Sequence, residues 1–218
     1  MWPLPTLSHK HVQIIIEPEA VSCYQITQHN EQLLPEAHQQ YELPPITTSI
    51  IPNPTALKNC ILTFIKAHHL DNSSCHIILT TPLIEEQLLS HHNSYAQLHH
   101  LIEADSMIHY NHTYIGPDND LFLFYVCGIP ETLLLQLKLI FMQLPVHLQT
   151  ISTPLHAQYE CYKKIYGSHV NQTQLIQSID KEKITIKNIL SAPLFQQQKR
   201  IVDENLLYAI GSFIGAHR

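Results

Sequence analysis

The chain has 218 residues, a length that fits one domain or two small ones with a substantial buried core. Charged residues make up only 14% of the sequence, and the formal net charge is −6, with 12 lysines and arginines spread thinly along it. Because nucleic-acid binding needs a concentrated basic surface, this composition argues against a nucleic-acid partner.

Cysteine usage and hydropathy indicate a protein of the cytosol. The five cysteines are an odd number and form no CxxC pair, which is typical of reduced thiols and not of a disulfide framework. The N-terminal residues lack the charged and apolar regions of a signal peptide. The most apolar stretch, 121–148, is interrupted by prolines and charges, so it does not supply the roughly 20 apolar residues of a membrane helix. We therefore expect no membrane insertion.

The first quarter of the chain predicts a hairpin followed by irregular chain. Residues 11–26 contain two apolar runs separated by Glu17–Ala20, a pattern typical of two antiparallel strands joined by a tight turn. Residues 30–54 are rich in proline, glutamine and threonine. We expect them to be irregular, except for one short strand near residues 46–51.

The rest of the chain alternates between helical and extended patterns. Helices are predicted where apolar residues recur every three or four positions, in several cases after a proline that favours the first turn. They span residues 54–68, 84–105, 131–142, 154–166 and 204–216. Strands are predicted at residues 75–80, 107–115, 121–127 and 146–151. Residues 168–203 are polar and weakly patterned.

The turn Glu17–Ala20 lacks the residues that a phosphate-binding loop needs. Backbone N–H groups hold phosphate in such a loop, and glycine permits the close approach and the positive φ angles. Pro18 removes one N–H group and fixes φ, while Glu17 and Glu19 add negative charge at the same place. The sequence therefore predicts that this turn does not bind ATP.

Large apolar residues cover most of the circumference of the predicted helix 131–142. A helix that is apolar on nearly all sides is either buried within the fold or covered by a partner. Leu134, Leu137 and Phe141 are the candidate partner-binding residues, and burial between a sheet and a neighbouring helix is the alternative interpretation.

The 17 histidines, several of them within residues 91–112, suggest a metal site at first sight. No HxxxH or HExxH motif occurs, however, and no cysteine lies at a ligand spacing. Solvated histidines in a sequence rich in glutamine and histidine explain the pattern. We therefore predict no catalytic, cofactor-binding or metal-ligating residues.

Three segments of the chain resemble the PilM family. They are Cys75–Leu89 (CHIILTTPLIEEQLL), Asp120–Tyr162 (DLFLFYVCGIPETLLLQLKLIFMQLPVHLQTISTPLHAQYECY) and Asn205–Arg218 (NLLYAIGSFIGAHR). Members of this family are actin-like cytoplasmic proteins of type IV pilus assembly, related to FtsA and to the cytoplasmic part of GspL. The chain departs from the family in lacking the phosphate loop and almost all of the second actin half, for which only residues 168–203 remain.

The resemblance implies an α/β fold with a degenerate actin-like (ribonuclease H-like) core, residues 1–82 and 148–218, and an inserted small α/β subdomain, residues 83–147. It implies a non-enzymatic cytoplasmic scaffold, a pseudo-ATPase, in a type IV pilus, competence or type II secretion-like assembly platform. The implied partner is an inner-membrane protein with a short cytoplasmic tail, which places the chain peripherally at the inner membrane. The rival interpretation is a small cytosolic metal-dependent hydrolase or transferase that uses the His-rich segment 91–112.

Overall fold

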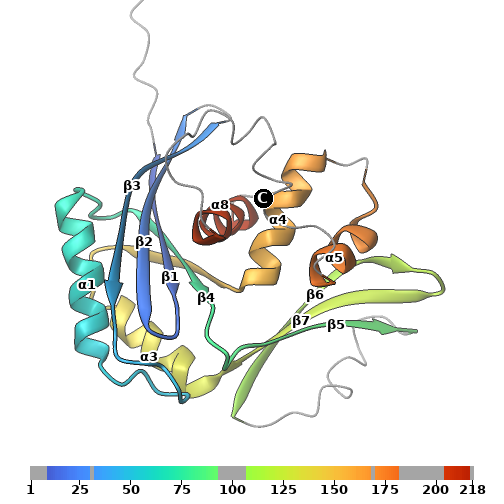
Figure 1. The fold of residues 1–218 in the computed structure, drawn as a ribbon, viewed down its shortest axis with the longest axis horizontal. Coiled ribbons are helices and arrows are strands. Elements are labelled where there is room, and N and C mark those ends of the chain that lie inside the picture. Colours follow the sequence, from blue (N-terminus) through green and yellow to red (C-terminus); the bar gives the residue numbers. More distant parts are fainter. Residues whose placement is uncertain (1–8, 30–31, 93–106, 168–169, 182–203, 217–218) are drawn as a thin grey trace, which may run out of the picture.

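The computed structural model describes residues 9–29, 32–92, 107–167, 170–181 and 204–216, which form two β-sheets and the helices around them (Figure 1). The larger sheet has the strand order β3-β2-β1-β4-β8, and the smaller has the order β5-β7-β6. The strands of the larger sheet are β1 (His9–Ile16), β2 (Ala20–His29), β3 (Gln32–Glu42), β4 (Ser74–Leu79) and β8 (His147–Ser152).

The larger sheet begins with the predicted hairpin and has a third strand that the sequence did not predict. β1 and β2 pair antiparallel, with Ile16 opposite Val21. β3, a strand of 11 residues, pairs antiparallel with β2, so the prediction of irregular chain was wrong for residues 32–42. Residues 43–53 are irregular as predicted, and the short strand expected near residues 46–51 does not form. Pro35 is tolerated because β3 is an edge strand, and because this proline lies at a shift in the pairing register opposite Ile26.

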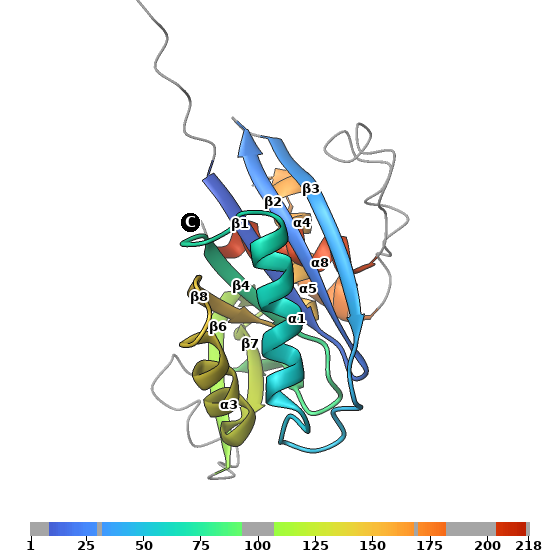
Figure 2. The same ribbon diagram turned by 90° about the vertical axis from the view of Figure 1, so that its left-hand side faces the viewer.

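Helices cover both faces of the larger sheet. α1 (Pro54–Ala67) and α3 (Glu131–Phe141) lie side by side on one face, as Figure 2 shows. α4 (Pro154–Tyr166) and α8 (Glu204–Ala216) pack on the other face, and α5 (Gln172–Asp180) contacts α4 (Figure 1). Side chains alternate along β1. Val12, Ile14 and Ile16 therefore pack in the core under α1 and α3, and Ile15 packs in the core under α4 and α8.

The smaller sheet lies in the chain between β4 and α3. It is formed by β5 (Glu85–His91), β6 (Ile108–Asp118) and β7 (Leu121–Pro130), with β5 and β6 both antiparallel to β7. The strands predicted at residues 107–115 and 121–127 are thereby confirmed. The predicted helix 84–105 was wrong where the structure describes it, because residues 85–91 are a strand; its remaining part, 93–105, lies outside the described residues. Pairing with β7 overrides the helix preference of the Glu, Gln and Leu residues there.

α8 belongs to the core although it lies at the end of the chain. Its residues 206–210 and Phe213 are buried against the larger sheet and α4. The close approach to α4 depends on Gly211: a Cβ atom at this position would lie 1.8 Å from the carbonyl oxygen of Ala157. At Gly215 a Cβ atom would instead meet the side chain of Glu160, at 3.1 Å. These two glycines therefore allow α8 and α4 to pack closely.

The two glycines of α8 provide a matched test of this packing. Each Gly→Ala change adds about 1 kcal/mol of helix propensity, so the difference between the two variants reports the contact with α4. Gly211→Ala should lower the free energy of unfolding by about 1–3 kcal/mol relative to Gly215→Ala, because the clash at residue 211 is with backbone and the one at residue 215 is with a side chain that can move. Urea unfolding measures both; equal stabilities would contradict the packing described here.

Candidate functional site

The turn Glu17–Ala20 is tied to the chain that follows β3. Within the turn, the Glu17 N–H donates to the carbonyl of Ala20 at 2.9 Å. The carbonyl of Pro18 accepts from the Ile46 N–H at 2.7 Å, and that of Glu19 accepts from the Leu43 N–H at 2.8 Å. The turn is therefore held by the segment after β3.

The carboxylate of Glu17 folds back over the start of β2 and the end of β3. It accepts hydrogen bonds from the Ser22 hydroxyl at 3.0 Å and from the Gln40 side-chain amide at 3.3 Å. A phosphate at this turn would meet a carboxylate in place of a backbone donor. This geometry supports the prediction made from the sequence of the turn.

A pocket of about 130 Å³ lies between the two sheets, next to the end of β8; we call it the inter-sheet pocket. Its lining includes Asn111 and Thr113 of β6, residues 150–153, His156 of α4, and Ser212 and Gly215 of α8. Because β1, β4 and β8 are parallel, their carboxyl ends lie on the same side of the larger sheet. The pocket and the β1–β2 turn both lie at these carboxyl ends, where ligands bind in many α/β folds.

A buried hydrogen-bond network on one side of the pocket connects the smaller sheet to the start of α4. The Tyr125 hydroxyl donates to the Glu86 carboxyl oxygen at 2.8 Å, and the Leu155 N–H donates to the same oxygen at 3.2 Å. The Tyr125 hydroxyl also shares a hydrogen bond with the hydroxyl of Thr153. Burial raises the pKa of Glu86, while its hydrogen bonds oppose that rise.

A second polar group, on the other side, connects the end of β8 to α4 and lies next to Ser212 of α8. The Ser152 hydroxyl lies 3.2 Å from Nδ1 of His156, and Nε2 of His156 lies 3.8 Å from a carboxyl oxygen of Glu160, which is only 2% exposed. Ser212 is 3% exposed, and its hydroxyl has no hydrogen-bond partner among the described residues. Hydroxyl groups thus line the pocket, and carboxyl groups lie behind them.

A row of polar side chains continues from the pocket across the larger sheet beneath α8. Nδ1 of His76 lies 2.9 Å from the hydroxyl of Thr150, and His76 is in register with Gln13 on β1. Gln13 is fully buried, and its side-chain amide has no partner among the described residues. The one thiol lining the pocket, Cys127, has its pKa raised to about 11, chiefly by burial, so it remains a neutral thiol near neutral pH.

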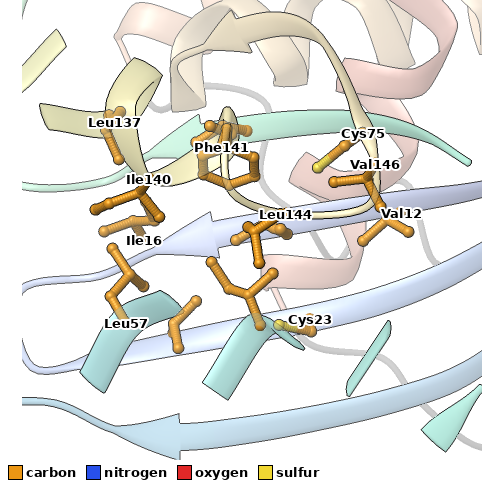
Figure 3. Close-up of a cluster of buried hydrophobic side chains, with 14 of the residues drawn as sticks. Val12, Ile16, Cys23, Leu57, Cys75, Leu137, Ile140, Phe141, Leu144 and Val146 are labelled. Carbon is orange, nitrogen blue, oxygen red and sulfur yellow. The ribbon is translucent and has the colours of Figure 1, made fainter. Parts of the chain in front are cut away.

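The structure places the three candidate partner-binding residues of α3 mostly inside the fold. Leu137 and Phe141 are buried and point toward the larger sheet, as Figure 3 shows, and Leu134 is half-buried. A partner reaches neither buried residue without displacing the core. The large apolar side chains that are exposed here are Leu135 and Leu139 of α3 and Met142, which directly follows it, with exposed fractions of 50%, 59% and 82%.

The His-rich segment lies partly outside the described residues, since the structure omits 93–106. Among the residues that are described, no three His, Cys, Asp or Glu side chains come together as a metal site would require. No helix within the described ranges is long and apolar enough to cross a membrane.

Sequence comparisons give no match, either to a family model or to a curated protein. Solved structures match in fold. A chain of a PilM–PilN type IV pilus biogenesis complex superposes with a TM-score of 0.57 at 8% identity, over 71% of this chain and 50% of that one. The cytoplasmic domain of EpsL, an inner membrane component of the type II secretion system of Vibrio cholerae, gives 0.41 at 14% identity, over 68% and 58%. RuvC of Thermus thermophilus gives 0.42 at 8% identity, over 94% and 91%.

The match to the chain of the PilM–PilN complex and the strand order confirm the fold class predicted from the sequence, an α/β fold with an actin-like (ribonuclease H-like) core. At such low identity the likeness shows the fold alone. This chain spans about half the length of the chain that it matches in the pilus complex.

The raised pKa of Glu86 predicts a pH-dependent contribution to stability. Between the ordinary carboxyl pKa and the raised value, the folded chain binds more protons at this site than the unfolded chain does. The free energy of unfolding of the wild type should therefore fall, relative to that of Glu86→Gln, as pH rises through this window, and then level off. Urea titrations at a series of pH values measure the difference.

The matched control is Glu42→Gln, which removes an exposed carboxylate from β3. A difference between wild type and Glu86→Gln that stays constant with pH, or that grows as pH rises, would show that Glu86 does not titrate as its burial requires.

Proposed function

We propose that this chain is a non-enzymatic scaffold of a type IV pilus, competence or type II secretion-like assembly platform. It would act in the cytoplasm, at the inner membrane, by binding the short cytoplasmic tail of an inner-membrane protein. The observation that carries the proposal is the fold match to a chain of a PilM–PilN complex, at a TM-score of 0.57 over 71% of this chain. The inter-sheet pocket supplies a place for the tail.

The edge of β8 is suited to binding an extended peptide. β8 pairs with β4 on one side, and no described strand pairs with its other side. Such an edge presents backbone N–H and C=O groups that an added strand can use, while neighbouring pockets select side chains. Residues 150–152, which end β8, and Thr153, which follows them, line the inter-sheet pocket, so a peptide along this edge would place a side chain there.

The size of the pocket favours a peptide side chain over a nucleotide. Its volume of about 130 Å³ is below the roughly 300–1,000 Å³ typical of pockets for small-molecule ligands. The neutral thiol of Cys127 and the carboxylate at the β1–β2 turn also support a binding role over a catalytic one. No cluster among the described residues favours the rival metal-dependent hydrolase or transferase.

Blocking the pocket should abolish tail binding. Thr113 is an exposed residue of β6 at the rim, so Thr113→Trp fills the pocket from a strand surface where tryptophan is well accommodated. The probes are synthetic peptides of the cytoplasmic tails of single-span inner-membrane pilus and secretion proteins from the source organism. We expect one tail to bind the wild type, and Thr113→Trp to weaken that binding at least about tenfold by fluorescence anisotropy.

Gln39→Trp is the matched control, because Gln39 is exposed on the distant edge strand β3. It should bind the same tail as the wild type does. Equal losses in both variants would point to a general effect of tryptophan, and failure of every tail to bind would refute the proposed function.

The scaffold proposal also predicts that Mg-ATP does not bind. Pro18 removes one of the backbone N–H donors that a phosphate requires, and the two glutamates beside it add negative charge where the phosphate would lie. Calorimetric titration with millimolar Mg-ATP should therefore give only the heat of dilution. Binding with micromolar affinity would contradict the pseudo-ATPase assignment.

A further inference from the structure

We infer that the inter-sheet pocket is selective for a basic side chain, lysine or arginine, of the bound segment. This inference rests on the proposed function, because it names the chemistry of the tail that the groove would accept. It is carried by the composition of the lining, by the carboxyl groups behind it, and by one buried hydroxyl that faces the pocket without a partner.

The described lining of the pocket offers hydrogen-bond acceptors, and its one basic side chain is that of His156, whose Nε2 lies 3.8 Å from a carboxyl oxygen of Glu160. None of the described lining residues is a lysine or an arginine, and most are hydroxyl or amide side chains. Gly215 and Ala216, which also line it, are the last described residues of α8. The carboxyl end of a helix carries a partial negative charge, which favours a cation nearby.

Two carboxyl groups lie directly behind this lining. Glu86 accepts its hydrogen bond from Tyr125, a lining residue, at 2.8 Å. Glu160 lies behind Gly215, where an added Cβ atom would come within 3.1 Å of its side chain. When ionised, these carboxyl groups attract a basic side chain and repel an acidic one.

The hydroxyl of Ser212 is a polar group of the pocket that a bound side chain could satisfy. This hydroxyl is buried, lines the pocket and has no hydrogen-bond partner among the described residues. A buried hydroxyl without a partner is unfavourable, and a donor group entering the pocket would satisfy it. An ammonium or guanidinium group brings several N–H donors on a long, narrow stem, which suits a cavity of about 130 Å³.

The proposed partner would present such side chains. Cytoplasmic segments next to membrane-spanning helices carry an excess of lysine and arginine. The chain itself has a formal net charge of −6, which favours its encounter with a basic segment.

The test is selection of a phage-displayed library of random decapeptides on the full chain at about pH 8, where a histidine side chain is ordinarily neutral. We expect the enriched peptides to share a lysine or arginine at one fixed position. In a synthetic copy of the strongest peptide, replacing that arginine by citrulline, or that lysine by norleucine, should weaken binding by about tenfold.

Variants of the chain separate the pocket from general electrostatics. Glu160→Gln should reduce the preference for the basic peptide to less than about threefold, and Ser212→Ala should weaken the basic peptide more than its neutral counterpart. Glu42→Gln removes the same charge from an exposed site on β3 and should leave the preference unchanged. If Glu160→Gln fails to fold, Ser212→Ala alone decides, since it removes only a hydroxyl.

The outcomes distinguish this inference from the proposed function. The selection could enrich peptides that bind the wild type, lose their binding to Thr113→Trp, and share no lysine or arginine. That result would overturn the inference and leave the scaffold proposal standing. A preference that survives Glu160→Gln and Ser212→Ala would also overturn it. A library that yields no binder would overturn both.

Discussion

The burial of β1 on both of its faces is the constraint on which the rest of the structure depends. One face of the strand packs under α1 and α3, and the other packs under α4 and α8. A single layer of helices would leave Ile15 or its neighbours Ile14 and Ile16 in water, at a cost of roughly 1.5–3 kcal/mol for each side chain. The carboxyl-terminal helix must therefore return to the sheet formed by the start of the chain, and Gly211 lets it approach closely.

The inter-sheet pocket follows from how the smaller sheet is fastened to this core. The Tyr125 and Glu86 side chains of the smaller sheet reach the start of α4, where they meet Thr153 and the Leu155 N–H. This network fixes the two sheets beside each other while β8 keeps one edge without a described strand partner. An unpaired strand edge next to a pocket with buried acceptors is a surface that an extended segment fits.

The sequence predicted most strands and helices but not the candidate site. The pocket is assembled from β6, β7, β8, α4 and α8, and no spacing along the chain relates residues such as Thr113, Ser152 and Ser212. The choice of residues on α3 shows the same gap. Its apolar side chains surround the helix, so periodicity could not tell Leu137, which is buried, from Leu139, which is exposed. Only the neighbouring sheet and α1 decide which side faces inward.

The sequence by itself determined the alternation of helices and strands, the hairpin that opens the fold, the glycine-free turn after β1, and the glycine pair of α8, because these depend on local periodicity and backbone chemistry. Tertiary structure decided the two elements that local patterns assigned wrongly. Gln32–Glu42 becomes a strand because β2 has an edge to pair with, which accommodates Pro35 at a register shift. Glu85–His91 becomes a strand because β7 pairs with it, against its preference for helix. In both cases, hydrogen bonds to a neighbouring strand outweigh local propensities of less than about 1 kcal/mol per residue. β2 directly precedes β3 in the sequence, whereas β7 is distant from β5, and long-range packing of this second kind also creates the pocket.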